Sequence, residues 1–195
     1  MIVVDTETTG VDPRKHSLLS IGAVDFDNPT RTFYIECRIF PEAHVDPEAL
    51  KINGFSEASL GDHLKKTDEE ALVLFLAWAK EAKDHTLAGQ NPSFDRDFLQ
   101  AAARRYHLDW PLAERTIDLH SVCYADMLKR NVEPPLQNRR SDLKLDAILA
   151  YVGLERGAGI HNALLDAEFE AEAFSRLFFN KPLLKKFESF SLPKH

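Results

Sequence analysis

The chain has 195 residues, of which 44% are hydrophobic and 28% charged, as expected for a folded domain with a sizeable core. Its net charge of −7 lacks the basic footprint of a typical nucleic-acid-binding protein, unless bound cations offset several acids. It has no apolar run of about 18 residues and no basic start ahead of an apolar stretch. We therefore expect no membrane span, no signal peptide and a cytoplasmic location, with Cys37 and Cys123 as reduced thiols.

Apolar, partly β-branched runs predict the strands. In chain order they cover 2–5, 17–26, 31–40, 85–89 and the beginning of 115–122. The turn sequence DNPT between the second and third runs predicts a hairpin. Because the strands come first as a meander and then alternate with helices, we expect one α/β domain with a mixed central sheet and helices on both faces.

Helical spacing and capping signals predict the helices. Asp46 is the expected cap of a short first helix, and Thr67 forms a capping-box pattern with Glu70 ahead of a longer one. The expected helices cover 46–52, 70–83, 92–107, 142–153 and 161–179. The proline-bearing stretch 130–141 predicts a polar loop.

Two carboxylates follow the first strand in the sequence VVDTETTG, residues 3–10. Asp5 and Glu7 are two residues apart, so on a strand they share a face and repel each other. A divalent cation would remove this cost, and Mg²⁺ and Mn²⁺ prefer oxygen ligands. Taken alone, such a pair of acids is more often a solvated turn.

Two more acids lie near expected helix starts. Asp95 falls in the first turn of the helix at 92–107, where it would also offset the helix dipole. Asp166 follows His161 by five residues, which places them about 140° apart around a helix. They converge only if His161 precedes the helix proper; otherwise His161 is a surface histidine. Together, four acids and a histidine would suit two-metal phosphodiester hydrolysis.

The sequences DTETTG, GQNPSFDRDFL and HNALLDA resemble, in this order, the three motifs of the DEDDh-type, DnaQ-like 3′–5′ exonucleases. That group includes bacterial proofreading subunits, ribonuclease T and oligoribonuclease. The resemblance spans residues 2–178 and implies a ribonuclease H-like fold with His161 as general base. The implied ligands of two divalent cations, Mg²⁺ or Mn²⁺, are Asp5, Glu7, Asp95 and Asp166.

The resemblance also implies contacts with the substrate. The residues in these positions are Thr8, Thr9, Gly10, Ile52, Asn53 and Phe94. Many members have a histidine that wedges the last two bases apart where this chain has Asn53, and an Asn-Gly turn explains that residue on structural grounds. Phe94 either stacks near a base or sugar or pairs with Phe98 in the core.

The implied reaction is hydrolysis of the 3′-terminal phosphodiester of single-stranded nucleic acid, with DNA slightly favoured over RNA, releasing nucleoside 5′-monophosphates. The alternatives are a catalytically silent nucleic-acid or polymerase-binding module, an RNA-trimming ribonuclease, and a metal phosphatase or endonuclease using the same acids. We expect an exonuclease domain at 1–180. The tail 181–195 would pack on it or mediate contact with a polymerase or a second copy.

Overall fold

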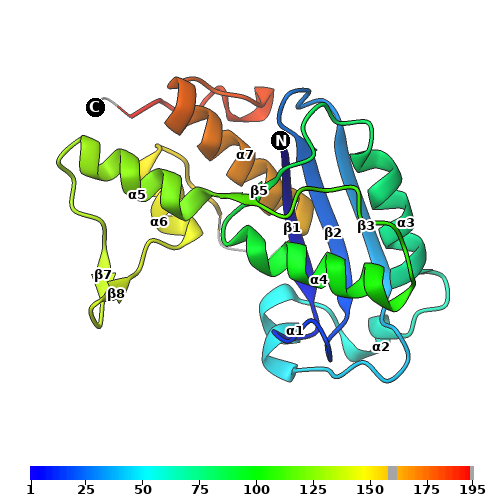
Figure 1. The fold of residues 1–195 in the computed structure, drawn as a ribbon. Helices are drawn as coiled ribbons and strands as arrows, with labels where there is room; N and C mark the ends of the chain where they lie inside the picture. The colour runs from blue at the N-terminus through cyan, green and yellow to red at the C-terminus, as the bar shows by residue number, and fades with distance from the viewer. Residues whose placement is uncertain (158–161, 194–195) are drawn as a thin grey trace.

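The computed structural model describes residues 1–157 and 162–193. Within this part, a six-stranded mixed sheet has the order β4-β3-β2-β1-β5-β6, with helices on both faces (Figure 1). The strands are β1 (Ile2–Thr8), β2 (Leu18–Asp25), β3 (Thr32–Arg38), β4 (Lys66–Thr67), β5 (Leu87–Gly89) and β6 (Thr116–Asp118). The helices are α1 (Pro47–Asn53), α2 (Glu57–Leu60), α3 (Asp68–Ala79), α4 (Pro92–Arg105), α5 (Leu119–Lys129), α6 (Leu145–Tyr151) and α7 (Ala163–Phe179). The predicted α/β class and mixed sheet are confirmed.

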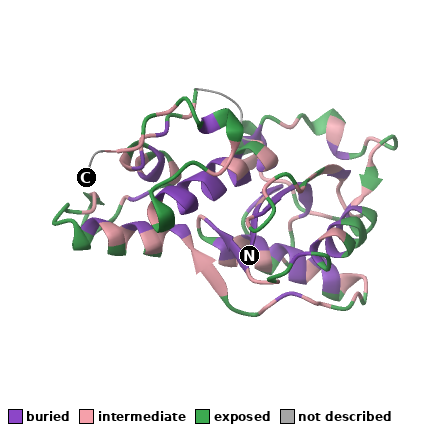
Figure 2. Ribbon diagram, turned by 90° about the horizontal axis from the view of Figure 1, so that it is seen from above, coloured by how far each residue is buried: buried purple, intermediate pink, exposed green. Residues whose placement is uncertain are grey.

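Side-chain alternation along β1 divides the core into two layers. Val3 packs in the cluster formed with α5, α6 and α7, whereas Ile2 and Val4 pack in the cluster formed with α3 and α4. Buried residues gather on the strands and on the sheet-facing sides of the helices (Figure 2). Because Asp5 and Glu7 continue the register of Val3, their side chains lie on the α7 face of the sheet.

The second half of β1 extends beyond its pairing with β5. β1 is antiparallel to β2 along its length, but it pairs with the short parallel strand β5 only at Ile2 and Val3. The start of α4 lies beside this half of β1, because Thr6 donates both its backbone N–H and its hydroxyl to Asp95 Oδ1, each at 2.8 Å. The first turn of α4, which carries Asp95, therefore lies next to the part of β1 that carries Asp5 and Glu7.

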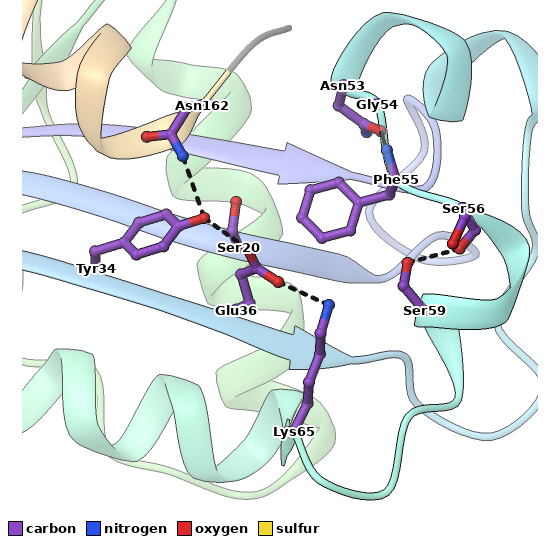
Figure 3. A pocket seen from close by; sticks show the side chains of 10 residues that line it. All are labelled: Ser20, Tyr34, Glu36, Asn53, Gly54, Phe55, Ser56, Ser59, Lys65 and Asn162. Atoms are coloured by element: carbon purple, nitrogen blue, oxygen red, sulfur yellow. Dashed lines mark hydrogen bonds and ion pairs between the residues drawn. The ribbon is translucent and has the colours of Figure 1, made fainter.

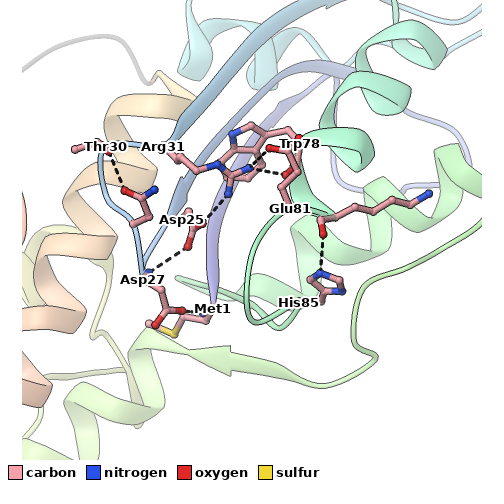
Figure 4. Close-up of polar contacts among 10 residues, drawn as sticks. Met1, Asp25, Asp27, Thr30, Arg31, Trp78, Glu81 and His85 are labelled. Carbon is pink, nitrogen blue, oxygen red and sulfur yellow. Dashed lines mark hydrogen bonds and ion pairs between the residues drawn. The ribbon is translucent and has the colours of Figure 1, made fainter.

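The start of β1 is fixed by polar contacts (Figure 4). The N-terminal ammonium of Met1 donates to Asp27 at 2.9 Å. Arg31, at the start of the adjoining hairpin strand, donates to Asp25 at 2.7 Å and to the backbone carbonyl of Trp78 at 2.8 Å. The Arg31–Asp25 pair is largely buried and closes the β2–β3 hairpin, and the hydrogen bond to Trp78 joins this hairpin to α3.

Two parts of the chain differ from the sequence prediction. The stretch 130–141, predicted to be a loop, contains a small hairpin of β7 (Leu136–Gln137) and β8 (Arg140–Ser141). Its turn residues Asn138 and Arg139 both have positive φ, which closes a two-residue hairpin even though the strands lack an apolar alternation. The expected helix at 142–153 begins only at Leu145.

Residues after α7 return along that helix. They include a 3₁₀ turn, η1 (Lys185–Phe187), whose Phe187 packs on Phe169 with ring centroids 4.8 Å apart. The buried Glu172 accepts the backbone N–H groups of Leu183 and Leu184 at 2.8 and 3.0 Å. Across the described residues, no helix combines the length and the apolar character that crossing a bilayer requires. The predicted cytoplasmic location stays a prediction.

Candidate active site

Acids from two distant parts of the sequence meet on the α7 face of β1. Asp5, Glu7 and Asp166 each offer a carboxylate oxygen within 4.8 Å of the other two; we call this set the acid cluster. The cap of α7 places Asp166 in its first turn, since the Asn162 side chain accepts the backbone N–H of Leu165 at 3.1 Å. Such a set of hard oxygen donors matches the ligand preference of Mg²⁺ or Mn²⁺.

Asp95 lies beside the acid cluster but is not a member of it. Its carboxylate is buried, and Oδ1 accepts the two hydrogen bonds from Thr6 described above. Its charge nevertheless contributes to the raised pKa values of Asp5 and Glu7. Asp95 is therefore oriented by β1 and electrostatically linked to the acid cluster.

Burial and neighbouring negative charges raise the pKa values of Asp5 and Glu7. Burial, followed by the charge of Asp95, raises the pKa of Asp5 well above its ordinary value. Burial, followed by the charge of Asp166, raises the pKa of Glu7 from 4.5 to about 7. The pKa of Asp95 is raised to about 7 by burial, although the hydrogen bonds from Thr6 favour its charged form. A bound divalent cation would reverse this balance by favouring the ionised carboxylates.

Glu170, which the sequence analysis missed, is a further buried acid at this site. It lies one turn after Asp166 on α7, is 1% exposed, and its Oε2 has no hydrogen-bond partner among the described residues. Burial and then the charge of Asp95 raise the pKa of Glu170 well above its ordinary value. Gly89 leaves room for this carboxylate, because a Cβ there would lie 2.9 Å from Oε2. The four-residue spacing from Asp166 was the signal available in the sequence.

Arg156 is a second residue that the sequence analysis missed. Its guanidinium donates to Asp166 Oδ1 at 2.5 Å and forms an ion pair with Asp146 Oδ1 at 3.1 Å. The same charge counteracts the raised pKa of Glu7. Arg156 thus supplies an internal cation to the acid cluster.

The residues after the acids of β1 are held by internal hydrogen bonds. The hydroxyl of Thr8 donates to the carbonyl of Gly10 at 2.7 Å, and that of Thr9 donates to the carbonyl of His44 at 2.6 Å. Gly10 permits a close approach of the backbone to His16, because a Cβ there would lie 2.3 Å from the imidazole. His161, the expected general base, lies outside the described residues.

The remaining predicted substrate contacts border β1. Asn53 is buried and donates to the carbonyl of Thr8 at 3.1 Å, so its amide has a structural role. Ile52 is 59% exposed beside it. Phe94 is partly buried and packs on Phe98 with ring centroids 4.8 Å apart, which is the core pairing considered from the sequence.

Comparison with known proteins identifies the family. The RNase_T exonuclease family model matches residues 2–174. The chain belongs to this exonuclease family. It is 29% identical over 178 residues to the 3′–5′ DNA exonuclease Cap18 of Escherichia coli, covering 89% of this chain and 88% of the relative. It is 32% identical over 187 residues to DNA polymerase III subunit epsilon of Rickettsia prowazekii, covering 90% of this chain and 72% of that relative. The epsilon subunit of Haemophilus influenzae is matched over 65% of its length.

Solved structures of other exonucleases share the fold. The nuclease domain of 3′hExo, described as a DEDDh family member bound to rAMP, has a TM-score of 0.70 at 18% identity, covering 99% of this chain and 95% of that one. The Escherichia coli ExoI–ssDNA complex has a TM-score of 0.73 at 18% identity, covering 90% and 39%. The predicted ribonuclease H-like fold and the assignment as a DnaQ-like 3′–5′ exonuclease are confirmed.

Proposed function

We propose that this exonuclease depends on two divalent cations and removes nucleoside 5′-monophosphates one at a time from the 3′ end of single-stranded nucleic acid. The observation that carries the proposal is the meeting of Asp5, Glu7 and Asp166 within 4.8 Å. Burial, together with the negative charges of neighbouring acids, raises the pKa values of Asp5 and Glu7, and this gives the site a physical reason to take up cations.

The residues divide into ligands and proton-handling groups. Asp5, Glu7 and Asp166 would hold the cations, with Asp95 completing the set from α4. Bound Mg²⁺ or Mn²⁺ would lower the pKa of a water molecule and stabilise the leaving 3′ oxygen. His161, five residues before Asp166, would accept the proton of the attacking water and must be neutral to do so.

The names of the relatives favour DNA as the substrate of this chain. Cap18 is named a 3′–5′ DNA exonuclease, and the epsilon relatives are named as DNA polymerase III subunits. The RNA-directed neighbour, a 3′-exonuclease that recognises histone mRNA stem-loop, is only 18% identical. The epsilon relatives also motivate a polymerase as a partner, with the segment after α7 as a candidate contact. Trimming of RNA remains the second candidate activity.

Degradation of end-labelled oligonucleotides tests the proposed function. DNA and RNA strands of one sequence, labelled at the 5′ end, are incubated with Mg²⁺, Mn²⁺ or EDTA. We expect a ladder that shortens from the 3′ end, only with metal, and faster for DNA. Asp5→Asn and Asp166→Asn proteins, purified identically, should be inactive. Internal cuts, or equal activity of either variant, would contradict the proposal.

A further inference from the structure

Glu170 is a buried carboxylate beside the acid cluster to which the proposed function assigns no role. It lies on α7 one turn after Asp166, is 1% exposed, and its Oε2 makes no hydrogen bond among the described residues. Burying a carboxylate oxygen without a partner is costly, because nothing replaces the water that it loses. An unpartnered oxygen of this kind in a folded protein therefore points to a ligand.

The surroundings of Glu170 hold its carboxylate next to β1. Although burial dominates in raising the pKa of Glu170, the backbone of Gln90 donates a hydrogen bond that favours its ionised form. Gly89 leaves the space for the unpartnered oxygen, because a Cβ there would lie 2.9 Å from Oε2 and 2.9 Å from the carbonyl oxygen of Val4. Oε2 therefore lies close to the peptide group that precedes Asp5.

Asp5 has a second set of acidic neighbours besides the acid cluster. After burial, the charges of Asp95 and Glu170 contribute most to the raised pKa of Asp5. The charges of Glu7 and Asp166, its partners in the acid cluster, contribute less. Asp95 is also the charged group with the largest effect on the pKa of Glu170, after burial. Asp5, Asp95 and Glu170 thus form a group of buried carboxylates on the side of β1 that faces β5 and α4.

The opposite side of the acid cluster offers no comparable carboxylate. A polar pocket of about 410 Å³ opens there, between β2–β3 and the segment containing α1 and α2, and its lining includes Ser20, the ladder partner of Glu7 (Figure 3). Glu36, the carboxylate in this lining, pairs with Lys65 at 2.7 Å and accepts the hydroxyl of Tyr34 at 2.9 Å. The acid with an unpartnered oxygen therefore lies on the β5 side.

We propose that Glu170 is a direct ligand of the second divalent cation, together with Asp5 and Asp95. This inference rests on the proposed function, in which the acid cluster holds the first cation. Oxygen atoms are the ligands that Mg²⁺ and Mn²⁺ prefer, and Oε2 of Glu170 is one without a partner. Thr6 donates only to Oδ1 of Asp95, which leaves Oδ2 for the same cation. The cation would turn three buried carboxylates that repel one another into a ligand set.

The number and affinity of bound Mn²⁺ ions test this assignment without relying on catalysis. Purified protein is titrated with Mn²⁺, and the free ion is followed by electron paramagnetic resonance. The wild-type protein should bind two Mn²⁺ per chain. Glu170→Gln keeps the shape of the side chain and removes its charge. It should weaken binding of the second ion by at least about tenfold and leave the affinity for the first nearly unchanged.

Two further variants separate a ligand from a distant charge. The matched control Glu168→Gln removes an acid two residues earlier on α7, whose carboxylate pairs with Lys186, and it should bind both ions as the wild type does. Glu170→Asp keeps the charge but shortens the side chain by one methylene, and it serves if Glu170→Gln does not fold. It should also weaken binding of the second ion, because the carboxylate is withdrawn from the cation.

The outcomes separate the inference from the proposed function. If Glu170 is a ligand, the Mn²⁺ concentration for half-maximal shortening of single-stranded DNA should rise about tenfold in Glu170→Gln, with kcat recovering at excess Mn²⁺. A Glu170→Gln protein that binds both ions as the wild type does, or a Glu168→Gln protein that loses the second ion equally, overturns the ligand assignment while leaving the exonuclease intact. A wild-type protein that binds fewer than two Mn²⁺, or that shortens no strand from its 3′ end, overturns the proposed function itself.

Discussion

Glu7→Gln should stabilise the metal-free protein at neutral and alkaline pH. Burial chiefly, and then the charges of Asp166 and Asp95, raise the pKa of Glu7 from 4.5 to about 7. The folded state therefore binds this proton more tightly than the unfolded state does. The contribution of protonated Glu7 to the stability of the folded state is fully present below pH 4.5 and is lost as the pH rises to about 7.

The size of the effect follows from the same values. At about 1.4 kcal/mol per pH unit, ionising Glu7 in the folded site costs on the order of 3 kcal/mol. A glutamine has a similar shape and no proton to lose. The advantage of Glu7→Gln over wild type should therefore be near its minimum at pH 4, grow between 4.5 and 7, and remain constant above this range.

Denaturant unfolding in EDTA, from pH 4 to 8.5, measures the difference in unfolding free energy between the two proteins. Groups elsewhere titrate in both proteins and cancel in the difference. With saturating Mn²⁺ the sign should reverse, because the wild-type carboxylate then gains a ligand interaction that the amide lacks. A difference in EDTA that stays constant with pH, or that favours wild type at pH 8, would refute the electrostatic account of the acid cluster.

Further predictions concern the site and the packing beneath it. Arg156→Gln should tighten Mn²⁺ binding about tenfold in calorimetric titrations, because its guanidinium competes for Asp166; unchanged or weaker binding would contradict this. His161→Ala should lower kcat by about 10²–10⁴-fold with Mn²⁺ affinity unchanged, and wild-type turnover would exclude it as the base. Gly22→Ala should lower the unfolding free energy by about 2–3 kcal/mol, because its Cβ would lie 2.1 Å from the backbone of α7. Gly61→Ala is the control, because a Cβ at this position would have no atom within 4 Å. Equal losses of unfolding free energy in the two variants would contradict the packing account.

Features with a local cause were predictable from the sequence. The capping box of Thr67 and Glu70 and the Asp46 cap of the first helix are both confirmed. The hairpin of β2 and β3 is also confirmed, because its turn and apolar runs are contiguous in the chain. The shared face of Asp5 and Glu7 follows from strand periodicity alone.

Features that depend on long-range packing were not predictable in this way. Arg156 donates to Asp166, ten residues later, and no periodicity of the sequence encodes that contact. Glu170 has the helical spacing of a buried residue, but the sequence alone predicts that an acid at this position is exposed. Its burial depends on the packing of α7 against the sheet. The pocket beside Ser20 combines two strands with the α1–α2 segment, so its existence depends on the assembled sheet.

Binding of Mn²⁺ to the purified protein, followed by electron paramagnetic resonance, tests the central claim most directly. The account predicts that the wild-type protein binds Mn²⁺ and that Asp5→Asn and Asp166→Asn each weaken this binding by at least about tenfold. Equal binding by all three proteins would contradict it, because the cations would then have to lie elsewhere than at the acid cluster.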